Sequence, residues 1–574
     1  MKIPNGWEEA QKALRANMTP RHKRLDLYER YVEGTQYEGL ASWYNDNVPL
    51  LERAPNIVEP VAAKAIVSFV SLCLGETRWP GITIAPSQED VFDEALRVGD
   101  DAAEIIDRGL SHISHQSQLE TVARTALSQA MGCGTAVAIA SVKDGSLCIE
   151  TPKAKWCLPT FNETQPKIVD ELEIRYCYLR EYKDTITGRW CVEALLYRRK
   201  ICKEFDVTYK PAKASEDGAE PDAWIPEVEI RHGLGFCPVV WYPFETTYQT
   251  AGKIDGHPIH ERLLDEIDAL NRSLSQHDRA SLYVGDPQPI EIGVDEDYNP
   301  APTGRIAEPM RHYAGESPYI RGQNEKWSMG GTTASSVVRR KGPGVVWRYP
   351  SKDSKVSFLS LPSGALESIQ KNIYDLREQL SEALSWVRVD PGTLRGSSAG
   401  AFNISGRALQ WMYRRQTDRC DMIRPDFEQG FVLPILNVLL RICLALAKRG
   451  DRGLYLAGIN ELAAALVQFE QPIADAEGDS LRWFMPPIEV NWGLYFENTA
   501  TDWAQIGEQT REDLGSGIID KQTAVRQMAP FYDIQNPHEY AEQMAEHEHA
   551  HAASLQGAIE ALNEATPEDE DEES

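Results

Sequence analysis

The chain has 574 residues, 42% hydrophobic and 25% charged, an ordinary globular composition with room for three or four domains. Its formal net charge of −28 argues against a surface built to grip nucleic acid non-specifically, because such surfaces carry excess lysine and arginine. The N-terminus lacks an apolar stretch, so we expect no signal peptide, and ten scattered cysteines without a C-x-x-C pair favour a reducing compartment.

Helices are predicted over most of the first 131 residues. Residues 7–44 are charged and helical and end in an aromatic cluster, an apolar helix ends near Gly75, and residues 89–131 predict another helical block. The apolar stretches 58–74 and 431–447 are each shorter than the roughly 20 apolar residues that a membrane span requires. We therefore interpret both as core helices.

A β region follows. Gly132-Cys133-Gly134 is interpreted as a helix stop, because the dinucleotide-binding turn that it partly matches would follow a strand. Asp144-Gly145 predicts a tight turn between two strands, and the pattern from Lys167 to Trp241 predicts further strands.

Two amphipathic helices are predicted on either side of an irregular segment. Apolar residues recur at steps of three and four from Ile259 to Leu274 and again from Leu366 to Val387. Residues 286–350 between them are rich in proline and glycine, which predicts a small irregular β module.

A glycine- and serine-rich loop, residues 392–403, precedes a long helical pattern that runs to about Arg449, with breaks predicted at Pro425 and Pro434. A loop held between long helices is suited to presenting backbone and short side chains to a bound or passing partner. Arg407, Arg414, Arg415 and Arg419 form a charged stripe on the long helix. In so acidic a chain we interpret this stripe as an intramolecular or intersubunit salt-bridge face in preference to a DNA-binding one.

The last part of the chain predicts a strand at 487–492 and a helical pair at 501–514 and 520–529. Residues 564–574 contain seven acids in eleven positions, a composition that cannot pack a core and predicts disorder.

Catalytic motifs are absent from the sequence. There is no G-x-x-x-x-G-K-[ST], G-x-S-x-G or H-E-x-x-H. His547, His549 and His551 could ligate a metal, but a solvated helix explains them more simply. We therefore predict no catalytic residue, no metal and no cofactor.

Six segments, in order, resemble the portal proteins of tailed bacteriophages. The sharpest is Asn403-Ile404-Ser405-Gly406-Arg407-Ala408-Leu409, which is similar to the start of that family's long helix after its tunnel loop. The other five are Tyr31–Gly34, Pro55–Val58, the helix and hairpin at 127–149, Gly233–Val240 and Leu514–Thr523.

The resemblance implies a mainly helical α+β portal fold, assembled as a ring, usually a dodecamer, at one vertex of the capsid. Double-stranded DNA would pass through the ring during packaging and ejection. The implied partners are the major capsid and scaffolding proteins, the large terminase subunit and a head–tail adaptor, with no membrane. The ring would assemble in the bacterial cytoplasm and reside in the virion.

The resemblance also implies a division of the chain into regions. These are the wing (1–257), stem helix 1 (258–285), the clip (286–350), stem helix 2 (351–388), the tunnel loop (389–403), the long wing helix (404–449), the crown (450–563) and the acidic tail (564–574). The implied DNA-facing residues are Arg395, Gly396, Ser397, Ser398, Ala399, Gly400, Ala401, Phe402 and Asn403.

Two alternatives stay open. One is a phage-encoded metal-dependent nuclease or hydrolase using Asp265, Glu266 and Asp268, although acids at this spacing on a charged helix are more simply a solvated or intersubunit face. The other is a different head or connector component that assembles without DNA passage.

Overall fold

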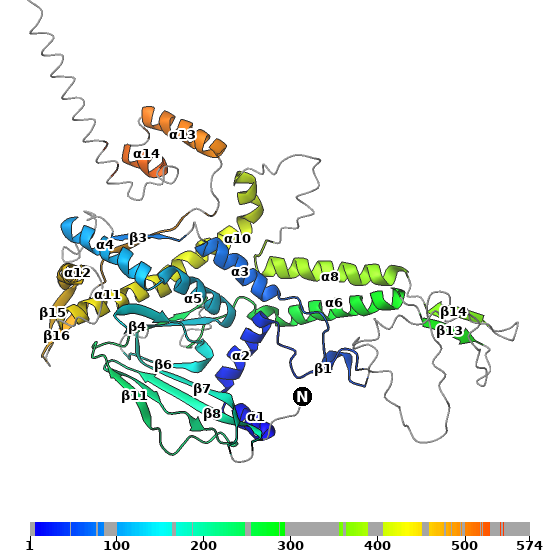
Figure 1. The fold of residues 1–574 in the computed structure, drawn as a ribbon. Helices are drawn as coiled ribbons and strands as arrows, with labels where there is room; N and C mark the ends of the chain where they lie inside the picture. Colours follow the sequence, from blue (N-terminus) through cyan, green and yellow to red (C-terminus); the bar gives the residue numbers. More distant parts are fainter. Residues whose placement is uncertain are drawn as a thin grey trace, which may run out of the picture. The chain divides into compact units, whose positions relative to one another are not determined.

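The computed structural model describes most of the chain. The described residues are 6–45, 47–75, 79–84, 100–163, 168–185, 188–246, 254–285, 288–292, 355–359, 363–387, 406–449, 458–475, 478–483, 485–493, 495, 500–516, 518, 521–528, 540 and 544. The fold is α+β (Figure 1). It divides into two units, residues 1–271 with 376–574, and residues 272–375.

Local signals set the boundaries of the first helices. Helix α2 (Pro20–Glu33) begins with Pro20 after Thr19, whose hydroxyl accepts the His22 N–H, and it ends at Gly34 in the left-handed conformation. Proline is preorganised for the first helical position, and glycine carries no penalty at positive φ. The neighbouring helices of the first unit are α1 (Trp7–Ala16), α3 (Val61–Leu74), α4 (Asp100–Gln116) and α5 (Leu119–Cys133).

The predicted helix stop and hairpin are confirmed. Helix α5 ends at Gly134 with φ 82°, and β4 (Thr135–Lys143) turns into β5 (Ser146–Glu150) through Asp144 and Gly145, both at positive φ. Strand β12 (Val239–Pro243) pairs with the other edge of β4, which makes a three-stranded sheet. Alternate residues of β4 belong to two different cores, because successive side chains point to opposite faces.

A larger antiparallel sheet follows β5 in the chain. It contains six strands in the order β11-β9-β8-β7-β6, with β10 paired to β8. The sequence pattern did not predict β9 or β6. The strands are β6 (Cys157–Phe161), β7 (Val169–Lys183), β8 (Trp190–Ile201), β9 (Phe205–Tyr209), β10 (Ala212–Lys213) and β11 (Pro226–Arg231).

The long helix is continuous, so the predicted breaks at its two prolines are wrong. Helix α10 (Gly406–Phe427) contains Pro425, passes through a π-helical turn, η6 (Glu428–Val432), and continues as α11 (Leu433–Lys448). A π-helical turn widens the backbone spiral locally, which accommodates the missing N–H groups and the pyrrolidine rings without a chain reversal.

This helix forms the centre of the main core. Between Tyr413 and Lys448 it is long and apolar enough to cross a membrane by length and composition, but more than half of its most apolar stretch is buried inside the protein. The rings of Phe427 and Phe431 stack 5.1 Å apart, and Leu436 and Leu440 are fully buried. Burial on this scale explains the apolar composition as that of a core helix.

Segments after the long helix return to the same core. Helix α12 (Ile459–Leu466) places Leu462 against Gly109 of α4, and β17 (Ile488–Asn491) pairs antiparallel with β3 (Gly81–Ile84). The predicted C-terminal strand and helical pair are confirmed, the pair as α13 (Ala500–Gly515) and α14 (Lys521–Met528).

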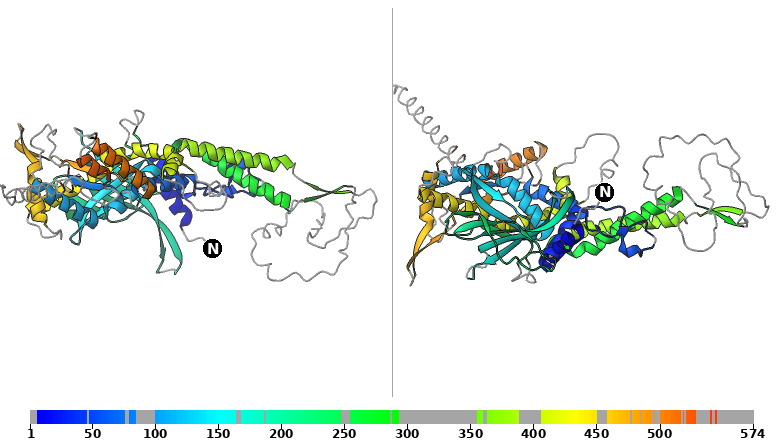
Figure 2. Two further views of the ribbon diagram at one scale, coloured as in Figure 1. Left: turned by 90° about the horizontal axis from the view of Figure 1, so that it is seen from above. Right: turned by 60° about the horizontal axis from the view of Figure 1, so that its bottom comes forward.

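The second unit is a helix pair with a β ladder. Helix α6 (Leu264–Gly285) enters it at Arg272, and α8 (Ser363–Ala383) leaves it at Asp375. The two helices run side by side in every view (Figures 1 and 2), and Asn372 Nδ2 donates to Ser273 Oγ at 3.1 Å. Strand β13 (Gln288–Ile292) pairs antiparallel with β14 (Lys355–Leu359), so the chain that leaves α6 meets the chain that enters α8.

Candidate functional site

All residues implied to face DNA lie outside the described part of the chain. This holds for Arg395 through Asn403, for the whole predicted tunnel loop, and for most of the predicted clip. Arg407 lies at the start of α10, but its side chain is not among those described. The candidate site is therefore built from the elements that flank the loop.

Two arginines of the predicted stripe make intramolecular ion pairs. Arg415 Nη1 lies 3.3 Å from Glu382 Oε1 near the end of α8, and Arg419 pairs with Glu245. Arg414 is exposed, and its guanidinium lies 5.5 Å from the ring centroid of Trp411. These contacts tie α10 to neighbouring segments of its own chain.

Arg424, on the same helix, is buried and contacts backbone carbonyls of neighbouring segments. It donates to Gly493 O at 2.9 Å, and its guanidinium lies 3.8 Å from the centroid of Tyr495. Its Nη2 also approaches the last carbonyls of α3, which have no intrahelical partner. Arg424 therefore links α10 to α3 and to the segment after β17.

A polar network joins α6 and α8 near the ends that lie in the first unit. We call it the stem-base network, and its members are Tyr31, Tyr37, Glu59, Asp268, Asn271 and Arg377. All six belong to the first unit.

The network has two connected halves. Arg377 Nη2 and Nε donate to Glu59 Oε2 at 2.8 and 3.0 Å, and the Glu59 N–H donates to Asn271 Oδ1 at 2.8 Å. Asn271 Nδ2 donates to Tyr37 Oη at 3.1 Å, and the Tyr37 and Tyr31 hydroxyls donate to Asp268 Oδ1 at 2.6 and 3.1 Å. Glu59, just before α3, is thus hydrogen-bonded to both α6 and α8.

Electrostatics favour the charged state of Glu59. Burial acts to raise the pKa of Glu59, but hydrogen bonds from Arg377 and Lys64 outweigh it and lower the pKa. At Tyr31 and Tyr37, burial and the bonds to Asp268 both raise the pKa, so the hydroxyls stay protonated as donors. The Glu59 carboxylate is therefore kept as an acceptor for Arg377, and the two tyrosine hydroxyls are kept as donors to Asp268.

A second cluster fixes the chain just before α6. Arg21 clamps Asp255 with Nε–Oδ2 and Nη2–Oδ1 distances of 2.8 and 2.7 Å, and Asp255 is 4% exposed. The Tyr28 hydroxyl donates to Glu261 Oε1 at 2.5 Å, and the fully buried His260 contacts Tyr28 O through Nε2 at 3.2 Å. Both clusters therefore position α6 against α2.

The acids suggested for a hydrolase do not converge in the structure. Asp265 is exposed, Asp268 accepts from two tyrosines, and Glu266 has one buried oxygen without a partner. Among the described residues, no group of three metal-ligating side chains comes together. The tyrosine cluster near residues 28–44 was visible in the sequence, but nothing in its spacing paired it with acids more than 200 residues away.

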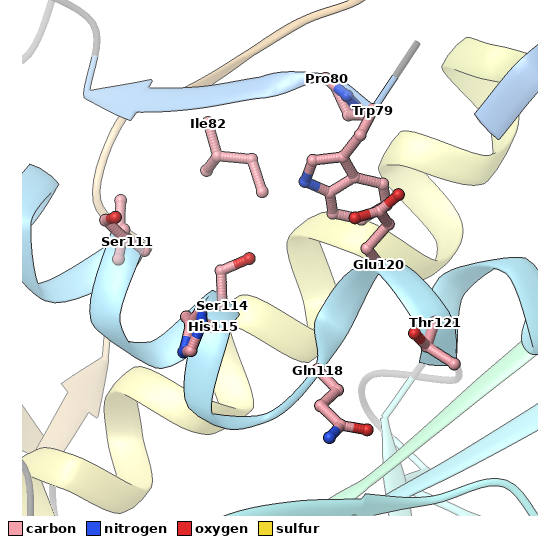
Figure 3. Close-up of a pocket in the computed structure, with 10 residues that line it drawn as sticks. Trp79, Pro80, Ile82, Ser111, Ser114, His115, Gln118, Glu120 and Thr121 are labelled. Carbon is pink, nitrogen blue, oxygen red and sulfur yellow. The ribbon is translucent and has the colours of Figure 1, made fainter. Parts of the chain in front are cut away.

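A cleft lies elsewhere in the first unit, between β3 and the junction of α4 and α5 (Figure 3). Its volume is about 510 Å³, and Trp79, Ser114 and His115 line it. Glu120 at its edge pairs with Arg124 within α5. This cleft holds no nucleophile–base pair and no unpaired charge that would mark a catalytic site.

A scan of known protein families found no family that matches this chain, and a search of curated proteins found no relative.

Proposed function

We propose that this chain is the subunit of a bacteriophage portal ring, through which double-stranded DNA enters and leaves the capsid. The observation that carries the proposal is the helix pair α6/α8, which is followed by the paired strands β13 and β14 at its far end and, later in the chain, by a long core helix. The portal resemblance implies this order of stem, clip, stem, tunnel loop and long helix.

The stem-base network suits such a role. A DNA conduit must hold its walls while a duplex moves past, and a partly buried network with every member hydrogen-bonded restrains the helices that it joins. Glu59 holds α8 through Arg377 and α6 through Asn271, so the two helices cannot separate at their bases without leaving buried polar groups unpaired.

The charge of the chain also suits passage of DNA without trapping. A net charge of −28 per subunit repels the duplex over most of the surface. In the proposal, contact with phosphate is confined to the loop that contains Arg395, and no catalytic residue is needed. The partners proposed are the capsid, scaffolding, terminase and adaptor proteins, in a virion assembled in the bacterial cytoplasm.

Negative-stain imaging and mass photometry of the purified full chain test the proposal. We expect symmetric rings with a central hole and a mass of roughly 770 kDa for twelve copies of the 64.4-kDa chain. Particles of one or two chains would contradict it. Large assemblies that lack a central hole would favour a head or connector component through which DNA does not pass.

A further inference from the structure

A second pocket, of about 290 Å³, opens beside the C-terminal half of α11 in the first unit. The helix contributes Arg441 and Lys448 to it, two turns apart on one face, and Arg449 follows directly. Phe236, from the turn before β12, and Trp483, at the end of β16 (Gly478–Trp483), provide aromatic walls. The pocket thus combines cationic and aromatic groups.

The positive charges of this pocket are not balanced within it. Lys448 pairs with Glu470, the one acid among the described lining residues, and Arg449 donates to the carbonyl oxygen of His232. Arg441 has no hydrogen bond or ion pair with any described residue, and its recorded contact is with the face of Phe236, 3.9 Å from the ring centroid. Among the described residues, Arg441 and Arg449 therefore have no carboxylate partner.

An arginine in this state is costly to the folded protein. Burial lowers the pKa of Arg441 to about 10, which reflects the loss of water around the guanidinium. A desolvated cation usually recovers that loss through an acid or several carbonyl oxygens. No nitrogen of Arg441 is both fully enclosed and unpaired. The guanidinium therefore reaches the open pocket.

We propose that this pocket binds a small organic anion, whose carboxylate or phosphate oxygens pair with Arg441 while its apolar body lies against Phe236 and Trp483. The planar guanidinium can present two parallel N–H groups to such an oxyanion. A volume of about 290 Å³ is at the lower end of ligand pockets, which favours one ring or a short chain over a nucleotide.

The proposal does not rest on the portal function, because it is argued only from the groups that line this pocket. It also differs from the stem-base network, whose arginine is already paired with Glu59.

Equilibrium dialysis of the full-length protein with benzoate, phenyl phosphate and inorganic phosphate tests the proposal at physiological salt. We expect about one equivalent of benzoate or phenyl phosphate per chain, and at least tenfold weaker binding of inorganic phosphate, which has no apolar body. The tighter binder of benzoate and phenyl phosphate shows whether the pocket prefers a carboxylate or a phosphate. No saturable binding of either aromatic probe at millimolar concentration would overturn the proposal.

Two substitutions locate the site. Arg441→Met keeps a long side chain over Phe236 but removes the charge, and should weaken binding at least tenfold; Arg441→Lys should bind with intermediate affinity because it keeps the charge without the planar fork. The matched control is Arg414→Met, since Arg414 also lies over an aromatic ring, that of Trp411, but is exposed and outside the pocket.

The control variant should bind like the unsubstituted protein. Equal affinity of the unsubstituted, Arg441→Met and Arg441→Lys proteins would overturn the assignment. If Arg441→Met does not fold, the Arg441→Lys result decides the question. The melting temperature without ligand provides a second readout. We expect Arg441→Met to melt no lower than the unsubstituted protein. If Arg441 served only to stabilise the fold through its contact with Phe236, the melting temperature of this variant would fall.

Discussion

Arg377 donates two hydrogen bonds to a single carboxylate oxygen of Glu59, across more than 300 residues of sequence. Because the Glu59 N–H is also bonded to Asn271, this one residue connects both long helices to the start of α3. The relationship makes Glu59 the most consequential acid at the base of the helix pair.

Substitution of Glu59 tests this role. Glu59→Gln keeps the shape and the backbone bond but removes the charge that Arg377 requires, and should lower the free energy of unfolding by about 1–2 kcal/mol. Chemical denaturation measures the change, and a double-mutant cycle with Arg377→Met isolates the pair. Lys64→Met, which removes the more exposed partner of Glu59, is the control and should change stability by less than about 0.5 kcal/mol. A coupling energy near zero would contradict the assignment.

Gly430, in the π-helical turn, packs against Tyr242. A Cβ at this position would lie 2.5 Å from Cδ2 of Tyr242, whose hydroxyl donates to Asp426 at 2.7 Å, so the ring cannot move freely. Gly430→Ala should therefore destabilise the protein by about 1–3 kcal/mol. Gly364→Ala in α8 is the matched control, because nothing lies within 4 Å of its added Cβ, and it should be neutral or slightly stabilising. Equal melting temperatures for the two variants would show that the turn adapts.

His260 should make stability depend on pH. Burial lowers the pKa of His260 to about 4 from the ordinary 6.5, against opposing contributions from the Tyr28 carbonyl and Glu261. Between pH 6.5 and 4 the unfolded chain binds a proton at this site and the folded chain does not, so folding weakens as the pH falls, by up to about 3 kcal/mol. Above pH 6.5 this histidine contributes no pH dependence.

The comparison that isolates this effect is with His260→Gln, which retains a side-chain amide able to contact the Tyr28 carbonyl. Denaturation midpoints of both proteins are measured from pH 4 to 7.5. The variant should gain stability relative to the unsubstituted protein as the pH falls. A difference that stays constant over this range would show that His260 takes up its proton in the folded state.

The proposed tunnel loop predicts a packaging defect. Replacement of Ala399, Gly400 and Ala401 by leucine should narrow the channel, and so reduce packaged DNA length and phage titre while rings still form. The control, Ala399→Ser with Ala401→Ser, keeps the residues small and should package normally. Normal packaging by the leucine variant would count against a DNA-facing position for these residues.

The hydrolase alternative makes an opposite prediction at Asp268. If this residue ligates a catalytic metal, plasmid DNA should be cut in the presence of Mg²⁺ or Mn²⁺, and Asp268→Asn should abolish the cutting. We expect no metal-dependent cleavage by either protein, because Asp268 is engaged by Tyr31 and Tyr37. Asparagine keeps an oxygen that accepts from both tyrosines, so the variant should still fold. Cleavage that depends on Asp268 would overturn the portal proposal in favour of an enzyme.

Local patterns in the sequence predicted the elements whose signals lie within a few residues. The end of α5 at Gly134, the hairpin at Asp144 and Gly145, and the helical faces of α6 and α8 follow from glycine conformation and from apolar spacing. The short strand β9 has a weak local signal, and the sequence pattern did not predict it. Pro425 is an ambiguous signal, and the helix break predicted there was wrong.

The amino-acid pattern alone was therefore sufficient for most of the long helices, the β4/β5 hairpin, the acidic character of the chain and the motifs that suggest a portal subunit. The pairing of the polar groups came from the fold: Glu59 with Arg377, Asp268 with two tyrosines, and Arg441 with the ring of Phe236 and with no acid among the residues that the structure describes. The physical reason is that helix and turn preferences act over a few residues, whereas the partner of a buried polar group is selected by packing between segments hundreds of residues apart.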